Sequence, residues 1–179
     1  DCTIEHSEEL VNRLEEENVP LFLSGHLHVQ HYMRNEEDRG IYEIVTSSLS
    51  TPPCQYGVLE YRDDETFSYH TQKVDMEKWA RKHKSTDENL LNFNTYAPAA
   101  LRTIFYNQSY DAMKDSEEEE TGDLFVKLTQ RQKEQMSEVY AQLNAACYGG
   151  KAYEVVKEAT TTPAYKMWQE YCYPMVLFE

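Results

Sequence analysis

The first part of the chain alternates between apolar runs and polar segments, a pattern typical of an α/β unit. Apolar side chains recur at helical spacing between Ser7, which can cap a helix, and Pro20, which ends one. The nearly all-apolar run 19–23 predicts a strand buried on both faces. The polar segment 24–28 leaves the carboxyl end of that strand, where α/β units place their functional sites.

The following residues predict two more strand regions. Residues 29–40 are polar and charged, which indicates a loop, and residues 41–46 have the composition of a strand. A second loop is predicted over residues 47–56 because it contains two prolines. Residues 57–62 and 66–74 then alternate apolar and polar positions around an acidic turn, which predicts a β-hairpin.

Helical patterns replace strand patterns near residue 75. We predict an acidic solvated segment at 116–120 and four helical regions: 75–84 with Met76 and Trp79 inward, 90–110 in pieces because of Pro98, 123–147, and a last helix opened by Pro163. The predicted fold class is therefore α+β, with a strand-rich part over residues 1–74 and a helical accessory region over residues 75–179.

Composition narrows the range of functions. The chain has 179 residues and a formal net charge of −15, so phosphate backbones repel it and we expect no nucleic-acid partner. A bound metal ion can still reverse the field locally for a small phosphorylated substrate. No run approaches the length of a membrane span, and the four cysteines form no Cys-x-x-Cys pair. Because the chain starts at Asp1 and enters a helix almost at once, we expect it to be part of a longer protein.

Two histidines, His26 and His28, stand one residue apart just after Gly25 and the first predicted strand. In an extended loop their side chains point to the same side, and each neutral imidazole can bind a metal ion. Histidine pairs also occur on surfaces without any ligand, so a purely structural role stays open. His31 either lines a substrate cleft or faces water.

The segment Leu21–His28 resembles the last conserved block of the calcineurin-like metallophosphoesterases, an apolar strand followed by Gly-His-x-His, and residues 42–59 resemble the bacterial branch of that family. The resemblance implies that this chain is the C-terminal half of the family's αββα sandwich, followed by a helical tail. It further implies that His26 and His28 bind a centre of two metal ions, drawn from Mn, Fe and Zn, that activates water for attack on phosphorus. Members of that branch are often exported or attached to the cell surface.

The family's earlier motifs are missing from this chain. It contains no Asp-x-His and no Gly-Asn-His, and its Gly122-Asp123 pair follows the histidines instead of preceding them. We therefore expect a two-metal phosphoester hydrolase that is inactive as this fragment and active only with its N-terminal half, which is then a partner beside the phosphorylated substrate. His6 could stand for the upstream histidine of the family, or be a surface residue near a helix cap.

A non-catalytic module is the alternative from another class. In that case the chain is an α+β interaction or metal-binding domain, and its two histidines do not take part in a reaction. Ser48 and Cys54 could be nucleophiles, but no base with a recognisable spacing accompanies them. The substrate, and the choice between a phosphomonoester and a phosphodiester, do not follow from the sequence.

Overall fold

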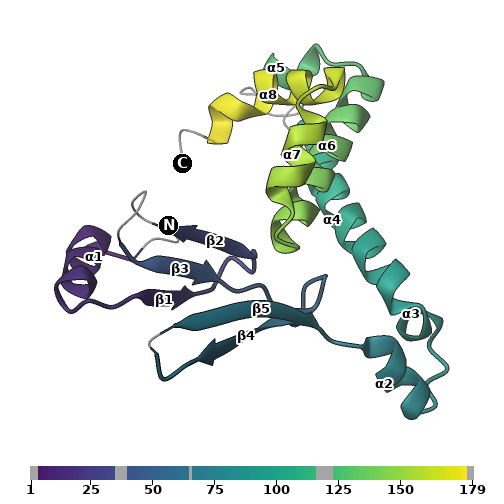
Figure 1. Ribbon diagram of the computed structural model, residues 1–179. Helices are drawn as coiled ribbons and strands as arrows, with labels where there is room; N and C mark the ends of the chain where they lie inside the picture. The colour runs from purple at the N-terminus through teal and green to yellow at the C-terminus, as the bar shows by residue number, and fades with distance from the viewer. Residues whose placement is uncertain (1–3, 35–39, 65, 116–122, 177–179) are drawn as a thin grey trace. The chain divides into compact units, whose positions relative to one another are not determined.

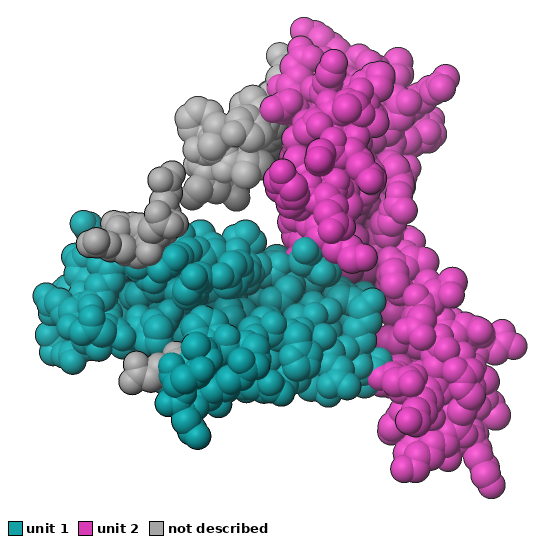
Figure 2. Space-filling model, in the orientation of Figure 1, with its two compact units in different colours: residues 1–74, 148–150 teal, residues 75–147, 151–179 magenta. Residues whose placement is uncertain are grey.

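The computed structural model describes residues 4–34, 40–64, 66–115 and 123–176 of the chain (Figure 1). The chain forms two compact units, coloured separately in Figure 2. Unit 1 comprises residues 1–74 and 148–150, and unit 2 comprises residues 75–147 and 151–179. Strands lie in unit 1, and helices make up unit 2, so the predicted α+β class with a helical C-terminal part is confirmed.

Unit 1 contains the helix α1 (Ser7–Glu16) and two small sheets. In the first sheet the central strand β3 (Tyr42–Val45) pairs in parallel with β1 (Leu21–Ser24) and antiparallel with β2 (His31–Arg34). The second sheet is an antiparallel hairpin of β4 (Gln55–Tyr61) and β5 (Phe67–Lys73). The hairpin and the strand at β3 are therefore confirmed.

The strand β2 lies inside the segment that the sequence predicts as a loop. Its pairing with β3 is supported by Tyr32, whose ring stacks on Tyr42 with 5.5 Å between centroids, and by Arg34, whose guanidinium lies 4.6 Å from the centre of the same ring. Cross-strand contacts of this kind stabilise a strand inside a segment whose overall composition is polar. The loop prediction is wrong for residues 31–34 because these contacts join residues distant in sequence.

Two further expectations for unit 1 are wrong. The strand β1 is not buried on both faces, because the Leu23 side chain is 53% exposed. Ser7 is the first residue of α1 and not its cap. The capping position is held by His6, which has a left-handed backbone and makes no capping hydrogen bond through its side chain.

The core of unit 1 lies between its two sheets. Ile44, in the middle of β3, is fully buried, and the Tyr42 ring meets Phe67 of the hairpin edge-on with 5.8 Å between centroids. Edge-to-face aromatic pairs add to the stabilisation that burial of their area provides. The two sheets are thereby fixed against each other within this unit.

Unit 2 is built from seven helices in its described residues: α2 (Met76–Lys82), α3 (Glu88–Leu91), α4 (Phe93–Asp115), α5 (Asp123–Val126), α6 (Gln130–Tyr148), α7 (Ala152–Ala159) and α8 (Pro163–Val176). Its apolar core contains Met113, Phe125, Leu128 and Met136. Met167, Trp168 and Tyr171 of α8 pack against this cluster. The acidic run 116–120 lies outside the described residues.

Several helix boundaries follow local signals. Asp75 caps α2 by accepting a hydrogen bond from the Lys78 amide at 2.9 Å, and α8 begins at Pro163 as predicted. The predicted helix 123–147 is instead divided at residues 127–129. There Thr129 and Gln132 form a reciprocal capping box that starts α6, because each accepts a hydrogen bond from the other's backbone amide.

Other predictions for unit 2 are wrong. Trp79 is 48% exposed, and the buried residue of α2 is Ala80. The segment 90–110 is helical in two pieces as predicted, but the break lies at Asn92, between α3 and α4, and not at Pro98. The helix α4 continues through Pro98 because a proline removes one backbone hydrogen bond while the rest of a long ladder remains. The helix α7 was not predicted.

Candidate functional site at the edge of the first sheet

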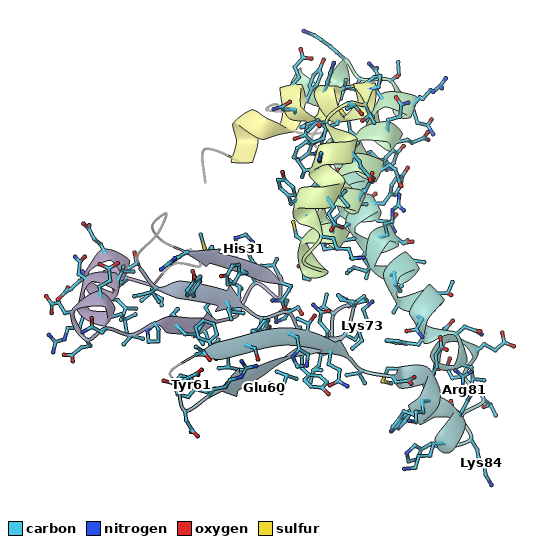
Figure 3. All side chains as sticks on the ribbon, in the orientation of Figure 1. His31, Glu60, Tyr61, Lys73, Arg81 and Lys84 are labelled. Atoms are coloured by element: carbon cyan, nitrogen blue, oxygen red, sulfur yellow. The ribbon has the colours of Figure 1, made fainter. Side chains whose placement is uncertain are left out.

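The connection from β1 to β2, residues 25–30, is here called the histidine loop. The pairing register places Ser24, Val45 and His31 side by side across the sheet. Because β3 lies between β1 and β2, the histidine loop must cross the carboxyl end of β3. His26 and His28 therefore lie at the same end of the sheet as His31, which Figure 3 labels where β2 begins. The sequence predicted this location from the end of the first strand.

The backbone of the histidine loop is not extended. His26 has a φ angle of 82° and His28 has a φ angle of 59°, both in the left-handed region. The premise that the two side chains share a side because the loop is extended is therefore wrong. Left-handed conformations of residues other than glycine are uncommon, and they cluster at functional sites. The three histidines at this end of the sheet are all exposed, so their rings are accessible to a ligand.

The first end of the histidine loop is fixed by hydrogen bonds within the sheet. The Thr46 amide donates to the Ser24 carbonyl at 3.1 Å, which extends the pairing of β1 and β3 by one residue. The Ser24 hydroxyl donates to a Glu43 carboxylate oxygen at 2.6 Å. These bonds tie the residue before Gly25 to β3, so the loop starts from a defined position.

The second end of the loop is held by Gln30, a residue that the sequence analysis did not identify. Its side-chain oxygen Oε1 accepts from the Ser47 amide, the Ser47 hydroxyl and the Tyr69 hydroxyl, each at 3.4 Å. Ser47 follows β3, and Tyr69 belongs to β5. No local sequence signal reveals these contacts, because the partners are 17 and 39 residues away.

This end of the sheet supplies only part of the ligand set that a metal centre needs. Imidazoles suit borderline ions such as Zn and Mn, so His26 and His28 could supply two ligands. Within the described ranges, however, no three His, Cys, Asp or Glu side chains are grouped to hold a metal ion. A centre of two metal ions needs several more ligands than these two rings provide. The described residues alone therefore do not fit such a centre.

The two other histidines of unit 1 and the two nucleophile candidates belong to other segments of the chain. His6 precedes α1 and lines a shallow depression with acidic residues of that helix. His70 lies exposed on β5, opposite Val58. The Ser48 hydroxyl is 2.8 Å from that of Ser50, which is not a base. Cys54 is buried, and burial raises the pKa of its thiol, which disfavours the reactive thiolate.

Glycine substitutions test the left-handed backbone of the histidine loop. A left-handed conformation costs a residue with a Cβ roughly 1–2 kcal/mol, whereas glycine adopts it freely. We therefore expect His28→Gly to unfold at higher urea concentration than His28→Ala, because its free energy of unfolding should be larger by about 1 kcal/mol. The same pair of substitutions at His70, in an ordinary strand, should reverse the order. Equal stability of both His28 variants would contradict a left-handed residue 28.

Comparison with known proteins gives one family. Residues 75–179, more than half of the chain, match the family described as the C-terminal domain of cyclic nucleotide phosphodiesterase. No curated protein matches the chain. None of the helices in the described ranges combines the length and apolar character of a membrane span.

This match corrects the resemblance drawn from the sequence. The assignment to the bacterial calcineurin-like metallophosphoesterases, with His26 and His28 in its Gly-His-x-His block, is wrong, because the matching family is a different one and the described residues lack a metal-binding group. A block as short as residues 21–28 carries too little pattern to identify a family. At a coarser level the expectation of a phosphoester hydrolase agrees with the match, since the family is phosphodiesterase-related.

Proposed function

Because the chain belongs to the family of the C-terminal domain of cyclic nucleotide phosphodiesterase, we propose that its protein hydrolyses the phosphodiester bond of cyclic nucleotides. The observation that carries this proposal is the match over residues 75–179, which covers the helical unit 2. The family description favours a phosphodiester over a phosphomonoester. The histidine loop of unit 1 is the part of this chain that we assign to the site.

We propose that His26 and His28 bind metal ions in this site, and that His31 contacts the phosphate of the substrate. The proposal is supported by their common position at one end of the sheet and by their exposure. Two ions of Mn, Fe or Zn, when bound, would lower the pKa of a water molecule for attack on phosphorus. The remaining ligands would come from a part of the protein outside this chain, because the described residues group no third one with the histidines.

The strand pairing of the first sheet supports a contribution from another part of the protein. Within the described residues β1 pairs only with β3, so one edge of Leu21–Ser24 presents unpaired backbone groups. Leu23 of the same strand is 53% exposed. An exposed apolar edge strand is a template for a further strand, and natural proteins usually cover such edges. We propose that another segment of the same protein pairs with β1 and brings the missing ligands to the histidine loop.

A hydrolysis assay of the full-length protein tests the function. After chelation and dialysis, the protein is titrated with Mn²⁺ or Zn²⁺ and supplied with a 3′,5′-cyclic nucleotide, a bis-aryl phosphate or a mono-aryl phosphate. We expect metal-dependent turnover of both diesters, slower turnover of the monoester, and no turnover by residues 1–179 alone. A full-length protein that turns over none of these substrates would instead favour the non-catalytic module. Preference for the monoester would refute the phosphodiesterase.

A further inference from the structure

We propose that Gln30 is a positioning residue that holds the histidine loop through Ser47 and Tyr69, and that Gly57 provides the space this arrangement requires. The inference rests on the proposed function, since it concerns the loop assigned to that site. Gln30 lies between His28 and His31, so its side chain controls the segment that presents both imidazoles. Ser47, Tyr69 and Gly57 are not candidate metal ligands.

The contact with Ser47 defines which atom of the Gln30 amide group faces the loop. A backbone N–H can only donate, so the Ser47 amide requires the carbonyl oxygen and not the NH2 group at this position. Ser47 is 8% exposed, which limits competition from water. A carbonyl oxygen has two lone pairs for the three donors around it. The three donors therefore share the two lone pairs, and at 3.4 Å each contact is longer than the usual distance of a hydrogen bond, so the oxygen holds its partners by three weak contacts together.

The third donor reaches Gln30 because residue 57 is glycine. In the hairpin, Tyr69 is paired with Leu59, and Gly57 is the diagonal neighbour on the same face. A Cβ atom at residue 57 would lie 2.5 Å from the Tyr69 hydroxyl oxygen and 2.6 Å from its ring carbon Cε2. The Tyr69 ring therefore lies across the backbone of Gly57. Glycine inside a strand weakens it and marks a site of close approach, which here is the approach of this ring.

These contacts join three separate segments at one point. The Gln30 oxygen links the histidine loop to Ser47, two residues beyond β3, and to the hairpin. The other end of the loop is already fixed by Ser24. With both ends held, the left-handed conformations at His26 and His28 persist because the surrounding contacts determine them. Loss of the Gln30 oxygen would free one end and misplace the imidazoles.

The test uses the full-length protein with Gln30→Ala, Gln30→Glu and Gly57→Ala. Removing a group that orients metal ligands typically lowers activity or metal affinity by roughly 10–100-fold. We expect Gln30→Ala and Gly57→Ala to lower kcat/KM for the cyclic nucleotide and Mn²⁺ affinity within this range. Gln30→Glu retains an acceptor oxygen and should stay within about threefold of the wild type. Equal losses in Gln30→Ala and Gln30→Glu would overturn the positioning role.

A matched pair separates the Gln30 contact from general effects on the hairpin. Tyr56 donates to Gln72 at 2.8 Å, which is also a tyrosine-to-glutamine hydrogen bond on the hairpin but does not touch the loop. Tyr69→Phe should weaken Mn²⁺ binding several-fold, whereas Tyr56→Phe should leave it unchanged. Equal effects of the two would refute the proposal.

Hydrogen exchange of residues 25–30 on the millisecond scale gives a readout independent of turnover. We expect faster exchange in Gln30→Ala than in the wild type or Tyr56→Phe. If this difference appears in a protein without phosphodiesterase activity, the positioning role stands and the proposed function fails. If the wild type is active and Gln30→Ala exchanges and turns over like it, the positioning role fails alone.

Discussion

Replacing either His26 or His28 with alanine is expected to lower kcat/KM of the full-length protein for a cyclic nucleotide by about 100-fold or more. Outer groups that merely orient metal ligands already contribute roughly 10–100-fold, so loss of a ligand itself should reach or exceed that range. Both rings are exposed, so their removal leaves no cavity in unit 1. We therefore expect the urea midpoint of the variants to stay close to that of the wild type.

Metal dependence distinguishes ligand loss from other causes of inactivity. If the imidazoles bind the ions, raising Mn²⁺ or Zn²⁺ should recover part of the lost activity, because the variants have a weakened site. His70→Ala is the matched control, since His70 is an exposed histidine of unit 1 outside the histidine loop. It should keep full activity. Full activity in both His26→Ala and His28→Ala would remove the histidine loop from the proposed site.

Local signals in the sequence were sufficient for some elements. Alternation over residues 57–62 and 66–74 around an acidic turn predicted the hairpin of β4 and β5, because register and turn lie close together in the chain. Pro163 predicted the start of α8, since its fixed φ favours the first turn of a helix. Such predictions depend on a few neighbouring residues.

Elements that depend on distant contacts could not be predicted in this way. The strand β2 lies in a segment, 29–40, that is mainly polar and charged, and its pairing is supported by an aromatic stack with Tyr42. The exposure of Leu23 depends on which distant segments cover that face of β1, which an apolar run by itself does not reveal. The capping box at Thr129 was a readable signal that was missed within a long helical pattern.

The candidate site shows the same division. The position of His26 and His28 beyond a strand end was visible in the sequence, because the apolar run and Gly25 precede them directly. Their left-handed backbone was not visible, since it depends on how the loop crosses β3. The same holds for the contact between Gln30 and Tyr69.

In unit 2 the largest expected loss of stability comes from Met136→Ala. Met136 is fully buried on α6 and belongs to the core cluster with Met113, Phe125 and Leu128. Truncating a buried methionine to alanine removes apolar contacts and leaves a cavity, which typically costs about 2–5 kcal/mol. That is a large part of the total stability of a small domain, about 5–15 kcal/mol. We expect Met136→Ala to lower the free energy of unfolding of unit 2 by about 2–5 kcal/mol, which is measured as a lower urea midpoint.

The measurement must report on unit 2 core packing, because a chain with two units need not unfold in one step. Trp168 packs against the core cluster, whereas Trp79 is 48% exposed on α2. In residues 1–179 a Trp79→Phe background therefore leaves Trp168 as the one tryptophan, and its fluorescence follows the core. Val126→Ala is the control, since Val126 adjoins Phe125 but is 54% exposed and should change the free energy of unfolding by less than about 0.5 kcal/mol.

The same variant examines what unit 2 contributes to function. The family match falls on residues 75–179, yet the histidine loop lies in unit 1. If unit 2 is needed for turnover, Met136→Ala should lose activity at the urea concentration where Trp168 reports unfolding, and Val126→Ala should keep it. Activity that survives the Trp168 transition would mean that the helical unit is dispensable for hydrolysis. An unchanged urea midpoint in Met136→Ala would contradict the packing of residue 136 in the core.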